Sequence, residues 1–364
     1  METNYEDLLN LTKDLHKSQE ILKSIKEANP EVVKKFPLKI SPYYLSLINW
    51  DDEEDSIAKM VVPSPEELNY KDIGTITHEH ENTKLFGLQH KYSQTALILV
   101  SNECASYCRY CFRKRFVGLH QKEIMRNFER AVEYIKKHPE INNVLLSGGD
   151  PLVLSTDNLR KILELLDPLS QLKFIRIGSK VPVTLPQRIL NDGDLLDLLH
   201  DYSRPTRRIH IQTHFNHPRE ITTKSIGAID ALLSANVMVQ NQSVLLRGVN
   251  DNPETLSELL NGLVGIGVNP YYIFQCRPFT FKPSAFQVPI WEGIDIIDET
   301  RKRLNGQSKR FKYVMSHATG KIEIIGKLGD EILFKYHQSK YPENHNKIFT
   351  RKLPHGEVWL WENT

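Results

Sequence analysis

Three of the four cysteines of the chain lie within one short loop, CASYCRYCFRKRF at 104–116. Cys104, Cys108 and Cys111 form a C-x3-C-x2-C pattern, and thiolates at this spacing are soft ligands for zinc or for an iron–sulfur cluster. A structural zinc ion usually takes four ligands from paired C-x2-C units, whereas the fourth cysteine, Cys276, is distant in the sequence. The pattern therefore favours a [4Fe–4S] cluster that leaves one iron open to bind a small molecule.

Two other interpretations of these cysteines stay open. A zinc ion could take Cys276 or a histidine as its fourth ligand. Alternatively, the three cysteines could be buried structural side chains, although the polar character of the loop argues against this.

The composition excludes several classes of protein. The chain has 364 residues, of which 40% are hydrophobic and 25% charged, and these values are typical of a soluble globular protein. A formal net charge of +2 gives no sign of nucleic-acid binding, and no apolar run approaches the ~18 residues of a membrane span. The charged start METNYEDLLNLTKDLHKSQ lacks the apolar core of a signal peptide. We therefore expect a cytoplasmic protein, in which cysteines serve as metal ligands or catalytic thiols.

From residue 95 onward, β-branched segments alternate with amphipathic ones. The expected strands lie at 95–100, 142–148, 173–179, 208–214, 237–246 and 270–276. Apolar residues at three- and four-residue spacing predict helices at 123–138, 156–166, 192–202, 223–235, 253–266 and 291–304. Six βα units predict a parallel α/β sheet, either an open partial barrel or a doubly wound sheet.

The regions on either side of this core do not show the alternation of strands and helices. Residues 1–90 look helical and polar, and residues 306–364 look like short strands that form a lid or a hairpin layer. We therefore expect a helical N-terminal region at 1–90, a core at 91–305 and a β-rich segment at 306–364.

Each expected strand ends in residues of the kind that bind ligands. The cysteine loop follows the first strand, and the next five end at SGGDP (147–151), GSK (178–180), THFNHP (213–218), NQS (241–243) and QCR (275–277). Because parallel strands gather their carboxyl ends at one edge of a sheet, these segments predict a single site.

Several motifs resemble the lysine 2,3-aminomutase family of radical S-adenosylmethionine (SAM) enzymes. They are ISPYYLSLINWDD, CASYCRYCFRKRFVG, LLSGGDPL, RIGSKVPVTLPQRI, THFNHPREI, NQSVLLRGVND and NPYYIFQC, which cover about residues 35–325 in the order of the family. The resemblance implies a partial (β/α)6 barrel, in agreement with the six units above. It also implies that the open iron chelates SAM, whose reductive cleavage gives a 5′-deoxyadenosyl radical.

The resemblance implies roles at the strand ends. The GGD turn matches the segment whose backbone receives the SAM amino group, and glycines permit such a close approach. Read alone, SGGDP could be only a tight turn, and His214 could be a structural histidine. Lys180 stands where the family commonly has arginine. The implied SAM-binding residues are Gly148, Gly149, Asp150, Ser179, Lys180, His214 and Gln242.

The family also uses pyridoxal 5′-phosphate (PLP), held as a Schiff base by a lysine. Lys321 in SHATGK matches that lysine, although only Gly320 remains of the glycine run that usually precedes it. Tyr92 matches a tyrosine that contacts the phosphate, and Lys91 stands where an arginine is common. Thr95 replaces a further basic residue. The alternative is that Lys321 is one exposed lysine among many.

The residues at the family's substrate-binding positions differ most from the family pattern. Arg113 matches the arginine that binds the α-carboxylate of the substrate. A guanidinium presents a fork of N–H donors, which suits a carboxylate. The alternative is that Arg113 only balances the charge of the cluster or of the helix that follows. Lysine mutases bind the distal ammonium with two aspartates, and this chain has Arg277 and Val314 at those positions. An arginine would repel an ammonium, so Arg277 predicts an acidic side chain on the substrate, unless it forms a structural salt bridge or a gate.

We therefore expect a radical SAM aminomutase, an isomerase that moves an amino group from the α to the β carbon of an amino acid other than lysine, such as glutamate. Two alternatives stay open: a PLP-independent radical SAM enzyme that abstracts a different hydrogen, and a non-catalytic iron–sulfur or zinc protein. The resemblance implies an electron donor such as flavodoxin or ferredoxin and a homo-oligomer, with no nucleic-acid or membrane partner.

Overall fold

The computed structural model describes residues 5–70, 79–119, 123–278 and 285–361. Within these residues, twelve strands form one sheet whose spatial order is the order of the strands in the sequence. The middle of the sheet, from β3 to β9, is parallel, and both ends are antiparallel. No described helix is long and apolar enough to cross a membrane.

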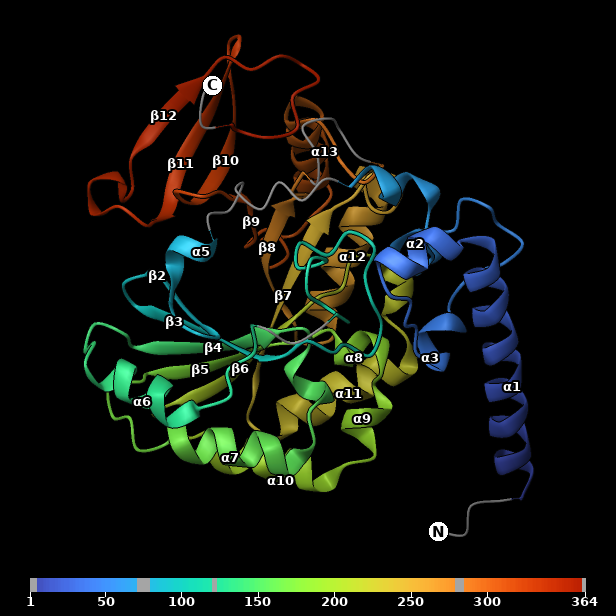
Figure 1. Ribbon diagram of the computed structural model, residues 1–364. Coiled ribbons are helices and arrows are strands. Elements are labelled where there is room, and N and C mark those ends of the chain that lie inside the picture. Colours follow the sequence, from blue (N-terminus) through green and yellow to red (C-terminus); the bar gives the residue numbers. More distant parts are fainter. Residues whose placement is uncertain (1–4, 71–78, 120–122, 279–284, 362–364) are drawn as a thin grey trace.

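The six expected βα units are confirmed. The strands are β3 (Thr95–Ser101), β4 (Asn143–Gly148), β5 (Phe174–Gly178), β6 (Arg208–Thr213), β7 (Met238–Leu245) and β8 (Asn269–Gln275). The principal helices that follow them are α6 (Phe128–Lys136), α7 (Thr156–Leu166), α10 (Gly193–Tyr202), α11 (Thr223–Ser234), α12 (Pro253–Gly265) and α13 (Ile290–Lys302). Short helices α8 (Val181–Thr184) and α9 (Gln187–Leu190) precede α10. The result is an open, partial α/β barrel with helices on its outer side (Figure 1).

Alternation along the strands explains which side chains face the interior of the barrel. In β5, Ile175 and Ile177 are buried beneath the helices, as expected for apolar residues two positions apart. Arg176, between them, therefore points to the opposite face, toward the interior. The same face carries the polar residues that build the site.

The C-terminal strands continue the barrel sheet instead of forming a separate layer. β9 (Lys312–Ser316) pairs in parallel with β8 and is a seventh parallel strand that sequence analysis did not expect. β10 (Gly320–Leu328), β11 (Glu331–Ser339) and β12 (Ile348–Arg351) then extend the sheet antiparallel, at the upper left of Figure 1. The predicted short strands exist, but they are an edge of the same sheet.

The N-terminal region is helical only as far as residue 82. Its helices are α1 (Tyr5–Ala28), α2 (Pro30–Lys35), α3 (Pro42–Leu45), α4 (Ser56–Val61) and α5 (Glu79–Asn82). The prediction of a helical region is wrong for residues 83–90, because β1 (Thr83–Leu85) and β2 (Leu88–Tyr92) form an antiparallel edge against β3. The division of the chain into three regions stays a prediction.

Candidate active site

The ends of the parallel strands surround a cavity of about 420 Å³. Every site residue predicted from the sequence lines it, although these residues come from eight strands or the loops next to them. They are Lys91, Tyr92, Cys104, Cys108, Cys111, Arg113, Gly148, Gly149, Asp150, Ser179, Lys180, His214, Gln242, Arg277 and Lys321. The structure thus brings the whole predicted set together, while the individual roles stay predictions.

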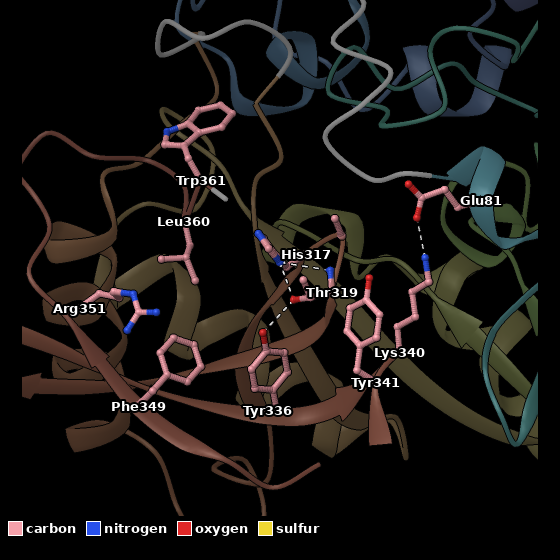
Figure 2. A pocket seen from close by; sticks show the side chains of 11 residues that line it. Glu81, His317, Thr319, Tyr336, Lys340, Tyr341, Phe349, Arg351, Leu360 and Trp361 are labelled. Carbon is pink, nitrogen blue, oxygen red and sulfur yellow. Dashed lines mark hydrogen bonds and ion pairs between the residues drawn. The ribbon is translucent and has the colours of Figure 1, made fainter. Parts of the chain in front are cut away.

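A second cavity, of about 410 Å³, lies between the C-terminal strands and the end of the described chain (Figure 2). Its walls include Tyr336, which is 2.9 Å from the Thr319 hydroxyl, and Lys340, which forms a 2.6 Å ion pair with Glu81. None of the predicted site residues lines this second cavity. The site of chemistry is therefore assigned to the first.

The cysteine loop is fixed by its contacts with the GGD turn. The backbone N–H of Gly149 donates to the Ser101 carbonyl at 2.6 Å, and that of Asp150 donates to the Glu103 carbonyl at 2.7 Å. A Cβ atom on Gly149 would lie 2.3 Å from the Glu103 carbonyl oxygen, and Gly148 has a φ of +121°. Both positions thus require glycine so that the turn can pack against the loop, a reason that does not depend on a ligand.

Three thiols suit an iron–sulfur cluster that leaves one iron open, whereas a structural zinc ion would need a fourth ligand. Cys104, Cys108 and Cys111 are partly buried and all line the cavity. Burial raises the pKa of Cys111 to about 11, so the thiol is protonated until a metal centre binds. Cys276 is fully buried and its Sγ donates to the Arg277 carbonyl at 3.7 Å.

These contacts predict different iron contents for two classes of cysteine variant. Replacing Cys104, Cys108 or Cys111 by Ala is expected to remove most of the iron and sulfide bound after anaerobic reconstitution, because each would supply one of three cluster ligands. Cys276→Ala is expected to keep both, and so serves as the matched control. Iron and sulfide analysis of the four variants checks this, and loss of iron from Cys276→Ala would favour a four-cysteine metal site.

The SAM-binding candidates are held by other protein groups. The Asp150 carboxylate accepts the backbone N–H groups of Lys180 at 2.6 Å and Val181 at 3.1 Å, so it ties the end of β4 to the end of β5. Burial raises the pKa of this carboxyl to about 6, and the surrounding hydrogen bonds oppose the rise. Ser179 is buried, and its hydroxyl accepts the Val181 N–H at 3.0 Å. The side chains of Asp150 and Ser179 therefore shape the cavity wall.

Lys180 and His214 both have protein partners. The Lys180 ammonium lies 2.9 Å from the buried carboxylate of Glu220. His214 places Nδ1 2.5 Å from the Gln242 carbonyl and Nε2 2.9 Å from the Tyr110 hydroxyl, and burial lowers its pKa to about 4. His214 is thus a neutral, hydrogen-bonded histidine, as the structural alternative expects. A contact of these residues with SAM stays a prediction.

Lys321 is a partly buried lysine that lines the cavity. Its Nζ lies 4.1 Å from the centre of the Tyr272 ring and 5.5 Å from that of Phe274. Burial, and then the cations of Arg176, Lys91 and Arg277, lower its pKa to about 7. The alternative that Lys321 is an exposed lysine is therefore wrong.

Lys91 and Tyr92 reach the same part of the cavity from β2. Burial also lowers the pKa of Lys91 to about 7, and its ammonium donates to the His317 carbonyl. Burial raises the pKa of Tyr92, so its phenol stays protonated. Both side chains can therefore donate hydrogen bonds to an anion there, Lys91 in its protonated form.

Two arginines share one aromatic ring at the substrate end. The guanidinium carbons of Arg113 and Arg277 each lie 4.6 Å from the centre of the Phe112 ring. Arg113 donates to the Ser147 hydroxyl at 2.8 Å, and its buried Nε has no hydrogen-bond partner. Arg277 donates to the Ser316 hydroxyl at 2.8 Å. Both arginines keep donor capacity for a carboxylate.

Comparison with known proteins identifies the family. The family model described as "Radical SAM superfamily" matches residues 98–260. A protein of Aquifex aeolicus with the provisional name L-lysine 2,3-aminomutase is 43% identical over 96% of this chain and 94% of its own length. The chain belongs to the lysine 2,3-aminomutase family of radical SAM enzymes. It is therefore an enzyme of the isomerase class, for which SAM and a [4Fe–4S] cluster are the expected cofactors.

Other relatives differ in their named substrate. The L-lysine 2,3-aminomutase of Clostridium subterminale is 39% identical over 80% of this chain and 70% of its own length. The glutamate 2,3-aminomutase of Clostridioides difficile is 35% identical over 79% of this chain and 67% of its own length. A solved radical SAM methyltransferase from Sphaerobacter thermophilus overlaps 62% of this chain and 68% of its own, with 16% identity and a TM-score of 0.42.

Sequence analysis of this family member missed two charged residues of the cavity. Glu79, in the N-terminal region, forms a 2.8 Å ion pair with Arg115 and lies 3.9 Å from Arg277. Arg176 donates to Asn143 at 2.6 Å, and its buried Nε has no partner. The alternation of β5 was a signal for Arg176, since it places a cation inside the barrel. Glu79 gave no such signal.

Proposed function

We propose that the chain is a PLP-dependent 2,3-aminomutase for an amino acid with an acidic side chain, with glutamate as the first candidate. The observation that carries the proposal is the amine of Lys321, with its pKa lowered to about 7, in the same cavity as three cysteines and two arginines. When bound, the cluster and SAM supply hydrogen abstraction, and PLP carries the amino nitrogen during the shift. The residues of this chain bind, orient and exclude water from the reacting groups.

The surroundings of Lys321 suit the aldehyde and phosphate of PLP. A lysine with a pKa of about 7 is about half neutral at pH 7, and only the neutral amine attacks an aldehyde. The phosphate would be met by Lys91, Tyr92 and Arg176. Arg176 also donates to the Thr95 hydroxyl at 3.4 Å, so it brings a cation to the place where Thr95 lacks the basic side chain of the family.

The substrate end of the cavity favours an anionic side chain. Arg113, Arg115 and Arg277 face one carboxylate, that of Glu79, whose pKa stays low despite burial because of these cations. A substrate with two carboxylates would place one on Arg113 and the other on Arg277, each by charge-assisted hydrogen bonds. The relative named for glutamate supports this choice.

Glu79 also favours a second candidate substrate. Its carboxylate lines the cavity, and relatives at 43% and 39% identity are named for lysine. If Glu79 were released from Arg115, it could receive a distal ammonium. We give glutamate precedence because Arg277, whose side chain is partly buried, would lie beside that ammonium.

An anaerobic substrate screen tests the proposal. Reconstituted protein is supplied with SAM, PLP and dithionite, and β-amino products of glutamate, aspartate, glutamine and lysine are measured by mass. We expect turnover of an acidic amino acid. Faster turnover of lysine would overturn the assignment of Arg277. SAM cleavage with no PLP bound would favour the PLP-independent alternative, and no SAM cleavage would favour a non-catalytic protein.

The rate of PLP attachment is expected to depend on pH in a way that reports Lys321. It should rise as the pH is raised through about 7 and level off above it, because deprotonation frees the amine. Arg176→Gln removes a cation that lowers the pKa of Lys321, so the midpoint should move upward. Borohydride trapping over a pH series measures the midpoint for the wild type and for Arg176→Gln. The control is Arg160→Gln, because Arg160 lies on α7 away from the cavity. A wild-type midpoint near that of a free lysine would contradict the assignment.

The proposal includes the partners that the family implies. A donor such as flavodoxin or ferredoxin would reduce the cluster in a cytoplasmic setting, and the chain would form a homo-oligomer. Reduction assays with purified donors and light scattering test these two points.

A further inference from the structure

A cluster of two histidines and one glutamate lies outside the cavity, where β2 meets the segment after α6. His90 is in β2, and His138 and Glu140 follow α6 in the sequence HPE. One ligand atom from each residue lies within 4.8 Å of the other two, and no other such group of three was found among the described residues. We propose that His90, His138 and Glu140 bind a divalent transition-metal ion, with zinc as the expected occupant.

The donor set matches the chemistry of zinc. Imidazole nitrogen and carboxylate oxygen are both zinc ligands, and a site with three protein ligands commonly completes its tetrahedron with water. The set contains no sulfur, unlike the cysteine loop. The two sites therefore differ in the kind of metal centre that each selects.

The orientation of His90 is already set by its neighbours. Its Nε2 lies 3.1 Å from the Ser93 carbonyl oxygen, which can only accept, so Nε2 carries the proton. The other nitrogen, Nδ1, therefore keeps its lone pair, which now accepts the Tyr134 hydroxyl at 3.0 Å. A backbone carbonyl that accepts the second N–H is the usual means by which proteins orient a ligating histidine.

The other two ligands are also held in place. The ring of His138 stacks on Tyr134 with centroids 4.2 Å apart, and its Nδ1 lies 2.9 Å from a Glu140 carboxylate oxygen. Tyr134 thus contacts both histidines and holds the cluster together. Little rearrangement is needed for an ion to replace the hydrogen bonds among these groups.

The site joins two segments that already meet through the backbone. Asn142 and Asn143 donate their N–H groups to the Gln94 carbonyl, at 3.1 and 3.2 Å. An ion would add a second connection, between β2 and the segment that joins α6 to β4. Because His90 directly precedes Lys91 and Tyr92, the ion would also fix the strand that carries these two residues into the cavity.

Zinc analysis of the cluster-loaded protein tests the proposal. After anaerobic dialysis against buffered zinc, we expect one zinc ion per chain, and at least tenfold weaker binding in His138→Gln and Glu140→Gln. Both side chains are about two-fifths exposed, so the variants are expected to fold, which circular dichroism and iron content would check. His200→Gln is the matched control, because His200 is also beside a carboxylate, Asp201, at 3.6 Å.

X-ray absorption at the zinc edge separates the two possible locations of the ion. A first shell of nitrogen and oxygen alone is expected for the histidine site. A sulfur shell would place the zinc ion on the cysteines and overturn the proposal. Equal zinc binding by the wild type and His138→Gln, or no zinc binding by the wild type, would also overturn it.

Discussion

Lys321→Ala is expected to lower aminomutase turnover by at least about 10³-fold, equivalent to about 4 kcal/mol of transition-state stabilisation. The amine of Lys321 lies in the cavity and is half neutral near pH 7, and no other described lysine combines that pKa with a position against Tyr272 and Phe274. Its loss removes the covalent attachment of PLP. The measurements are turnover, PLP content after gel filtration, and the absorption band of the PLP–lysine adduct.

A second lysine of the same strand is the control for this experiment. Lys327 lies on β10 as well, but pairs with Asp295 at the surface. Lys327→Ala should keep turnover and the absorption band. SAM cleavage without substrate turnover in Lys321→Ala would show that the cluster is intact and that only PLP attachment is lost. Full turnover in Lys321→Ala would contradict the proposed role.

Arg277→Gln is expected to lower kcat/KM for glutamate by about 10²- to 10³-fold, or about 3–4 kcal/mol, as is typical when one partner of a buried, hydrogen-bonded charge pair is removed. Arg277 is partly buried and donates to Ser316, so the neutral amide can keep the contact with the protein but not the charge. The measurement is a set of anaerobic steady-state rates on glutamate and on an uncharged amino acid of similar length.

Two comparisons make the test of Arg277 specific. Arg277→Lys should retain part of the rate on glutamate, because it keeps the charge but loses the planar fork. Turnover of the uncharged amino acid should fall much less than that of glutamate in Arg277→Gln. An equal fall on both substrates would mean that Arg277 supports the cavity and does not select the side chain.

The parts of the fold that follow from periodicity were predictable. Each expected strand and its following helix is present, because alternation and three- to four-residue spacing are local properties of the chain. β9 was not predicted as a barrel strand, since nothing within KYVMS says that its partner is β8. Likewise the short β2 depends on pairing with β3, and β1 depends on pairing with β2. Strand pairing depends on the tertiary structure, so the local sequence pattern does not predict it.

The candidate site was predictable where chemistry and spacing coincide. The three cysteines and the GGD turn were found in this way. Glu79 was not, because one carboxylate among many has no local mark. The partner of Lys180 was not predictable either, since Glu220 reaches it only through the fold. Charge pairs between distant segments are therefore the part of a site that sequence analysis misses.

The order of strands in the sheet has a consequence for biosynthesis. Each strand pairs with the strand that precedes it in the chain, so the sheet can grow in the order in which the ribosome delivers it. The cysteine loop and the GGD turn that supports it are made early, whereas Lys321 arrives on β10. A nascent chain can thus present its cysteines to iron before Lys321 exists, so under the proposed function the cluster would be loaded before PLP.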